Sequence, residues 1–126
     1  MPSSSTAISA SPSTPPDAGL REILKRYSLP TYDAARAFRR TRHARYLPSI
    51  VRGVLEQQVA ADLLPKLDLP AEQLRLVEDL GLDSLALIET ASALEDAVGF
   101  RIADEELRQL ATAADIERVL AVKSRA

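Results

Sequence analysis

The spacing of apolar residues predicts an all-α protein. From Pro48 onwards these residues recur every three or four positions, as they do along one face of a helix. The pattern predicts a first helix of about four turns, with Pro48 in its first turn. Its apolar face consists of Ile50, Val51, Val54, Leu55, Val59, Leu63 and Leu64. A second helix covers Ser84–Val98, and Gly99 is placed to end it.

Two shorter helices complete the predicted bundle. One fits Asp104–Leu110, and the next begins at Thr112, where Thr112 and Asp115 have the spacing of a capping box. Pro65 and Pro70 enforce a loop between the first two helices. We expect the leucines of that loop to lie over the core. The prediction is therefore a four-helix bundle over residues 47–126, with a short third helix.

The first 46 residues differ in composition from the rest. Twelve of the first sixteen are Ser, Thr or Pro, which cannot bury enough apolar surface to fold, so we predict a disordered tail over residues 1–18. Two short helical patterns follow, at Asp17–Leu29 and Thr31–Tyr46. We interpret residues 19–46 as a basic extension with at most marginal helices. It is a solvated linker, or an arm that folds back on its own domain or docks on a partner, and docking is the purpose we favour.

The charge of the chain changes sign at the same boundary. Residues 1–46 carry eight Lys and Arg against three acids, and residues 47–126 carry eight against fifteen. An acidic domain favours basic partner proteins and argues against nucleic acid as a ligand. No apolar run is long enough to span a membrane and no secretory signal pattern begins the chain, so we expect an intracellular protein, located in the cytoplasm. We also expect a monomer. An organelle transit peptide is the alternative for the extension, although its first twenty residues lack Lys and Arg.

The residue types present exclude several kinds of chemistry. The 126 residues include no cysteine, which removes thiolate nucleophiles, thiolate metal sites and disulfides. The single histidine, His43, has no HExxH or triad-like context. We therefore expect no metal site and no cysteine- or triad-based catalysis.

One short segment, EDLGLDSLALIE at Glu78–Glu89, suggests a specific chemistry. It places Ser84 at the first turn of the second predicted helix, directly after a glycine turn. Backbone N–H groups are unpaired at that end of a helix and the helix dipole is positive there, which favours a phosphate ester. The simpler interpretation is that Asp83 or Ser84 only caps the helix.

The residues after Leu76 resemble the acyl carrier proteins of fatty acid and polyketide synthesis. The resemblance rests on EDLG-x-DSL at Glu78–Leu85, ALED at Ala93–Asp96, DEEL at Asp104–Leu107 and TAADIERVL at Thr112–Leu120. It implies that Ser84 is esterified by 4′-phosphopantetheine from coenzyme A, whose thiol carries acyl groups as thioesters. The partners it implies are a phosphopantetheinyl transferase, and acyltransferases, ketosynthases or other acyl-processing enzymes with basic docking patches. Their contacts on this chain would be Asp83, Leu85, Glu89, Glu95 and Asp96.

Three departures from the family pattern leave alternatives open. Ala86 and Ala103 replace an acid and a proline that are common in the family, and the loop from Pro65 to Leu76 does not align cleanly. A peptidyl carrier protein is one alternative, although Leu82 stands where that family usually has a second glycine. The other is a helical interaction module with a basic arm, in which the serine is only a cap.

Overall fold

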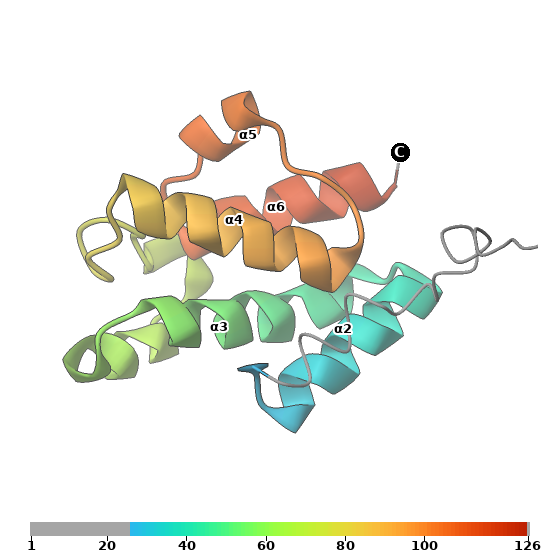
Figure 1. The fold of residues 1–126 in the computed structure, drawn as a ribbon, viewed down its shortest axis with the longest axis horizontal. Coiled ribbons are helices and arrows are strands. Elements are labelled where there is room, and N and C mark those ends of the chain that lie inside the picture. Colours follow the sequence, from blue (N-terminus) through green and yellow to red (C-terminus); the bar gives the residue numbers. More distant parts are fainter. Residues whose placement is uncertain (1–25, 126) are drawn as a thin grey trace, which may run out of the picture.

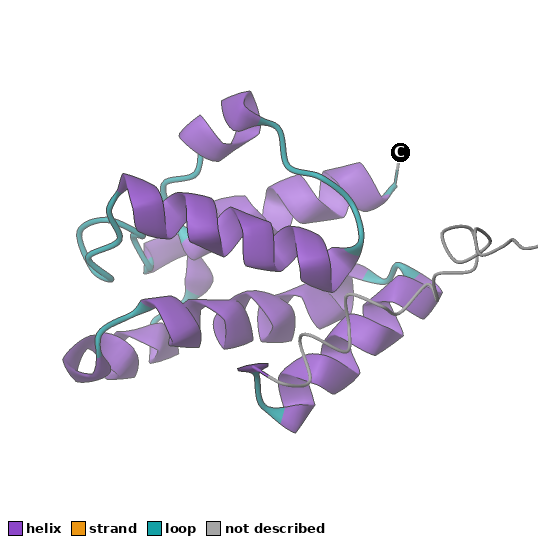
Figure 2. Ribbon diagram, viewed as in Figure 1, coloured by secondary structure: helices purple, strands orange, loops and turns teal. Residues whose placement is uncertain are grey.

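The computed structural model describes residues 26–125, which form an all-α fold (Figure 1). The predicted tail over residues 1–18, and most of the helical pattern at Asp17–Leu29, lie outside the described residues. With η marking 3₁₀ helices, the elements are α2 (Leu29–Thr41), η2 (Ala44–Tyr46), α3 (Leu47–Gln58), η3 (Ala61–Asp68), η4 (Ala71–Gln73), α4 (Ser84–Val98), α5 (Asp104–Arg108) and α6 (Ala113–Ser124). Figure 2 shows helices and loops but no strand between residues 26 and 125. Extended pairing in that range is limited to one bridge, from Arg75 to Thr112. The predicted all-α carrier-type bundle is confirmed.

The first predicted helix is shorter in the structure than its apolar pattern indicated. It begins as expected, with Pro48 in its first turn, but α3 ends at Gln58, and Val59 takes an extended backbone conformation. The prediction of a helix continuing to Leu64 is therefore wrong. The segment that follows, Ala61–Asp68, forms the 3₁₀ helix η3 instead, with Pro65 inside it.

The loop before α4 lies on the core, as its leucines predicted. Leu67, Leu74, Leu76 and Leu80 are buried, whereas Leu69 and Val77 remain exposed. Backbone hydrogen bonds join this loop to the start of α6. Leu76 N–H donates to the Ala111 carbonyl and Ala113 N–H donates to the Leu74 carbonyl, both at 2.9 Å. The loop therefore leads to α4 along a fixed path.

The remaining helices of the bundle follow the sequence closely. α4 has the predicted bounds, Ser84–Val98, and ends at Gly99 with a left-handed φ of 88°. The capping box at the start of α6 is confirmed, because the Thr112 hydroxyl accepts the Asp115 N–H at 3.2 Å and the Asp115 carboxylate accepts the Thr112 N–H at 3.0 Å. α5 ends at Arg108, before the predicted Leu110.

The basic segment before residue 47 belongs to the same core. α2 buries Thr31, Ala34, Ala35 and Phe38, and Figure 1 shows it beside α3, below the end of α4 that is far from Ser84. Gly53 of α3 permits this close approach, since a Cβ there would overlap the Thr31 side chain. Residues 29–41 of the extension therefore fold back on their own domain in the structure, which is one of the outcomes considered above. The domain boundary near residue 47 stays a prediction, although buried residues on both sides of it belong to one core.

Candidate functional site around Ser84

Ser84 is the first residue of α4 and is exposed to solvent. Asp83 is the N-cap, and its carboxylate accepts the Ala86 N–H at 2.8 Å. The Ser84 side chain is exposed, and its hydroxyl has no hydrogen bond with any residue in the range 26–125. Of the two capping residues considered, Asp83 therefore does the capping. The hydroxyl of Ser84 is left available for chemistry.

The turn before α4 pushes this serine outward. Gly81 has a φ of 67°, and Leu82 is then drawn into the core, where only 2% of it is exposed. The Leu82 N–H donates to the Leu76 carbonyl at 3.1 Å. Because Leu82 is anchored inward, Asp83 and Ser84 lie at the surface.

The electrostatics at this helix start suit a phosphate. The N–H groups of Ser84 and Leu85 lie in the first turn, where no helical carbonyl precedes them, and Asp83 serves only the next amide. The helix dipole adds partial positive charge at the same end. The residues present thus fit a phosphodiester on the Ser84 oxygen.

A groove between α4 and α5 begins at Ser84. It has a volume of about 340 Å³ and is lined by Ser84, Leu87, Ile88, Asp104, Leu107 and Arg108. Leu87 and Leu107 are half-buried, so the groove has an apolar floor with charged residues at its rim. Ile88, which is 56% exposed, was not among the predicted site residues. The sequence signal that could have identified Ile88 is that it is an apolar residue on the solvent-facing side of α4.

The structure separates the five predicted partner-contact residues into two groups. Asp83, Leu85 and Glu89 are exposed around Ser84, with Leu85 64% exposed. Glu95 and Asp96 lie near the other end of α4. The Glu95 carboxylate accepts the Ile102 N–H at 2.7 Å, and the Asp96 carbonyl accepts a hydrogen bond from Arg39 of α2.

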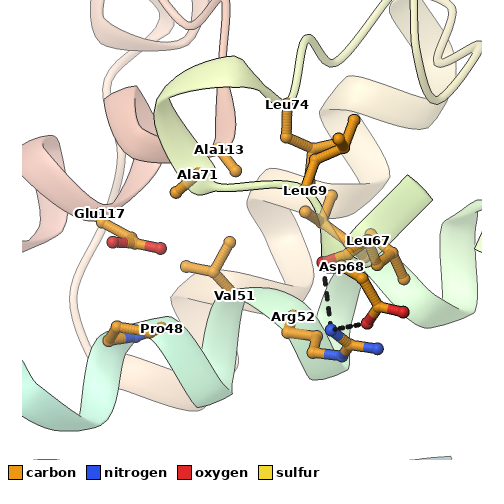
Figure 3. A pocket seen from close by; sticks show the side chains of 11 residues that line it. Pro48, Val51, Arg52, Leu67, Asp68, Leu69, Ala71, Leu74, Ala113 and Glu117 are labelled. Atoms are coloured by element: carbon orange, nitrogen blue, oxygen red, sulfur yellow. Dashed lines mark hydrogen bonds and ion pairs between the residues drawn. The ribbon is translucent and has the colours of Figure 1, made fainter. Parts of the chain in front are cut away.

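A second hollow, of about 280 Å³, lies between α3, the η3–η4 loop and α6 (Figure 3). On one side Arg52 donates to the Leu67 carbonyl at 3.1 Å and pairs with Asp68 at 2.9 Å. On the other side lies Glu117, where burial and the nearby negative charge of Glu72 raise the pKa of the carboxyl above its usual range. No residue of α4 or α5 lines this hollow, so it is separate from the Ser84 groove.

Two kinds of site have no candidate in the described part of the chain. Between residues 26 and 125 no three His, Cys, Asp or Glu side chains are grouped so as to hold a metal ion. None of the helices in that range is both long and apolar enough to cross a membrane.

A small helical bundle with an exposed serine at a capped helix start defines a class of carrier domain. Residues 54–120 match the family model of the phosphopantetheine attachment site. The chain belongs to this family, the acyl carrier proteins. Helix α2 lies outside the matched residues.

Individual relatives agree with the family match. An acyl carrier protein of Saccharopolyspora erythraea is 43% identical over 60 residues, which are 44% of this chain and 63% of the relative. The anthracycline acyl carrier protein DauA of Streptomyces sp. strain C5 is 37% identical over 62 residues, 49% of this chain and 71% of the relative. The acyl carrier protein MbtL of Mycobacterium tuberculosis is 35% identical over 78 residues, 62% of this chain and 93% of the relative.

The extent of these matches is partial. This chain spans just under two thirds of the length of the Saccharopolyspora relative and of the acyl carrier protein of Wolinella succinogenes. No solved structure matches the chain.

Proposed function

We propose that this chain carries acyl groups as thioesters on a 4′-phosphopantetheine arm attached to Ser84. The observation that carries the proposal is the Ser84 hydroxyl itself. It is exposed, it is relieved of capping by Asp83, and it lies inside the residues that match the attachment-site family. The acyl group would belong to fatty acid, polyketide or related lipid synthesis, as in the named relatives.

Attachment requires one substitution at phosphorus. The Ser84 oxygen attacks the phosphorus of coenzyme A that bears the pantetheine, and a new oxygen–phosphorus bond forms. The phosphoanhydride bond breaks, adenosine 3′,5′-bisphosphate leaves, and the serine proton passes to a base of the transferase. The attached arm supplies the thiol, in a chain that has no cysteine of its own. The amides of the first turn of α4 stabilise the phosphodiester charge.

The partner surface centres on the Ser84 end of α4. Asp83, Leu85 and Glu89 surround the attachment point and would meet basic patches on the transferase and on acyl-processing enzymes such as acyltransferases and ketosynthases. Glu95 and Asp96 would add less, because Arg39 and Arg101 line the same hollow and offset their charge. The protein would act without catalysis of its own, as a monomer in the cytoplasm.

Intact mass spectrometry tests the attachment. The full chain is incubated with coenzyme A, Mg²⁺ and a broad-specificity phosphopantetheinyl transferase, and its mass should rise by one phosphopantetheine. Ser84→Ala should abolish the gain, whereas Ser92→Ala, an exposed serine on the same helix, should leave it intact. An undiminished gain in Ser84→Ala would refute the site. No gain in the wild-type chain would favour the helical interaction module.

A loading assay separates acyl from peptidyl carriers. The modified chain should accept a malonyl or other acyl group from an acyltransferase. Exclusive loading with an amino acid by an adenylating enzyme would instead support the peptidyl alternative.

A further inference from the structure

We infer that Arg39 of α2 is a positioning residue for the groove beside Ser84, because it holds the connection between α4 and α5. The inference rests on the proposed function for the identity of the cargo, and on geometry alone for the coupling between α2 and the groove. Arg39 lies outside the residues that match the family, so this device is a property of the extension.

The guanidinium of Arg39 binds the last turn of α4. Its Nε donates to the Ala97 carbonyl at 3.1 Å, and a terminal nitrogen donates to the Asp96 carbonyl. Carbonyls in the last turn of a helix lack intrahelical partners and lie at the negative end of the dipole, so a cationic donor is favourable there. A planar guanidinium reaches both carbonyls at once, which a lysine ammonium does less well.

The residues immediately after α4 are held by the same helix. Gly99 lies against Arg39, since a Cβ at Gly99 would be 3.4 Å from the Arg39 guanidinium carbon. The Phe100 ring is near Phe38 of α2 and near Arg42, the C-cap residue of α2: its centroid is 6.4 Å from that of Phe38 and 5.7 Å from the Arg42 guanidinium. Phe38 is fully buried, so these contacts attach the segment between α4 and α5 to the core.

The position of α5 depends on this connection. α5 has five residues, none of them buried, and a helix of that length is not stable by itself. It is anchored before its start by Ile102, whose N–H donates to Glu95, and in its middle by the Glu106–Lys123 ion pair at 3.0 Å. Releasing the connection would loosen the first anchor, because Ile102 closely follows the residues that Arg39 and Arg42 contact.

The groove beside Ser84 has one wall on each of these helices. Leu87 and Ile88 come from α4, and Leu107 and Arg108 come from α5. If α5 moves away, the apolar floor opens to water. Cargo lying in the groove would then lose protection, although Arg39 touches neither Ser84 nor the groove.

The test measures protection of a bound thioester in the full chain. An octanoyl-phosphopantetheine arm is placed on Ser84 with octanoyl-coenzyme A and a transferase, and the rate of thioester cleavage by hydroxylamine is followed. Arg39→Met should raise this rate and the amide hydrogen exchange of residues 104–108 roughly tenfold, as expected when a charged hydrogen-bonded pair is lost. Arg39→Lys should rescue part of the protection.

Arg36→Met is the matched control, because Arg36 is exposed on the outward face of α2 and bonds to no residue between 26 and 125. It should behave as the wild type. Unchanged rates of thioester cleavage and amide hydrogen exchange in a folded Arg39→Met variant would overturn the inference. Amide exchange that rises equally in all helices, with a matching loss of thermal stability, would also overturn it. If Ser84 accepts no phosphopantetheine, amide hydrogen exchange in the unmodified chain still tests whether Arg39 positions α5. The failure of the attachment proposal can therefore be told apart from the failure of this inference.

Discussion

The two ends of α4 differ in how the rest of the chain treats them. At the start of the helix Ser84 is exposed, and so are the apolar side chains of Leu85 and Ile88, which nothing in the described chain covers. At its end Ala97 and Val98 are buried, and Arg39 occupies the last carbonyls. The first turn of this helix is therefore exposed, whereas its last turn is packed against α2.

The covered end depends on a segment that the family match does not include. Phe38 and Arg39 belong to α2, whereas the residues of the open end lie within the match at 54–120. The candidate attachment site therefore lies within the part of the chain that matches the family. The contacts that hold the far end come from outside the matched residues, and they lie away from Ser84, so α2 packs on the domain without covering the serine.

The largest expected effect comes from removing the α2 side chains that pack at the end of α4. Phe38→Ala should lower the free energy of unfolding by about 3–5 kcal/mol, because a fully buried aromatic side chain is lost. Deleting residues 1–46 should cost at least as much, which is a large part of the roughly 5–15 kcal/mol that stabilises a small domain. Urea unfolding followed by circular dichroism measures both changes. If residues 47–126 alone unfold no earlier than the full chain, the predicted boundary at residue 47 is correct and α2 is an appendage.

A pair of glycine substitutions compares the rigidity of the two ends. Both glycines have positive φ, 67° at Gly81 before α4 and 88° at Gly99 after it, where an L-residue costs about 1–2 kcal/mol. Gly99→Ala should show the full cost because the Arg39 contacts prevent relaxation. Gly81→Ala should cost less, since a Cβ there would meet only Leu63, at 3.6 Å. Equal losses of stability in thermal denaturation would show that the far end is no stiffer than the near end.

Acid should weaken the segment that leads to the open end. The Arg75 side chain, with the Arg75 N–H, lowers the pKa of the Asp79 carboxyl in the folded chain below its ordinary value of 3.8. The ionised carboxylate therefore contributes stability above the unfolded pKa, and this contribution is lost as the pH falls through the folded pKa. Asp79→Asn should lower the unfolding temperature at neutral pH, and its difference from the wild type should shrink below about pH 4. A difference that stays constant with pH would mean that the ion pair adds no stability.

Charge reversal on α4 should have the smallest effect on the structure, and its main effect should be on the rate of phosphopantetheine transfer. Glu89→Lys should slow phosphopantetheine transfer at low salt with little change in helical content, because exposed charges act mainly on association. Asp96→Lys should slow it less, since Arg39 and Arg101 are close to that end. Both effects should decrease as salt is added. Equal slowing by the two variants would place the whole length of α4 in the partner contact.

Local signals in the sequence determined much of the fold and the candidate site. The bounds of α4, the stop at Gly99 and the capping box of Thr112 were predicted because each depends on residues a few positions apart. The position of Ser84 at a helix start was predicted for the same reason. Its role as the attachment point stays a prediction that mass spectrometry can test.

Tertiary packing decided the features that depend on distant residues. The weak apolar pattern of α2 indicated a marginal helix, but α3 and α4 bury Phe38 and make the helix part of the core. The same packing directs Glu95 to the Ile102 amide and brings Leu107 opposite Ile88 to form the groove. Helix caps and turns are encoded in neighbouring residues, whereas burial depends on which faces meet in three dimensions.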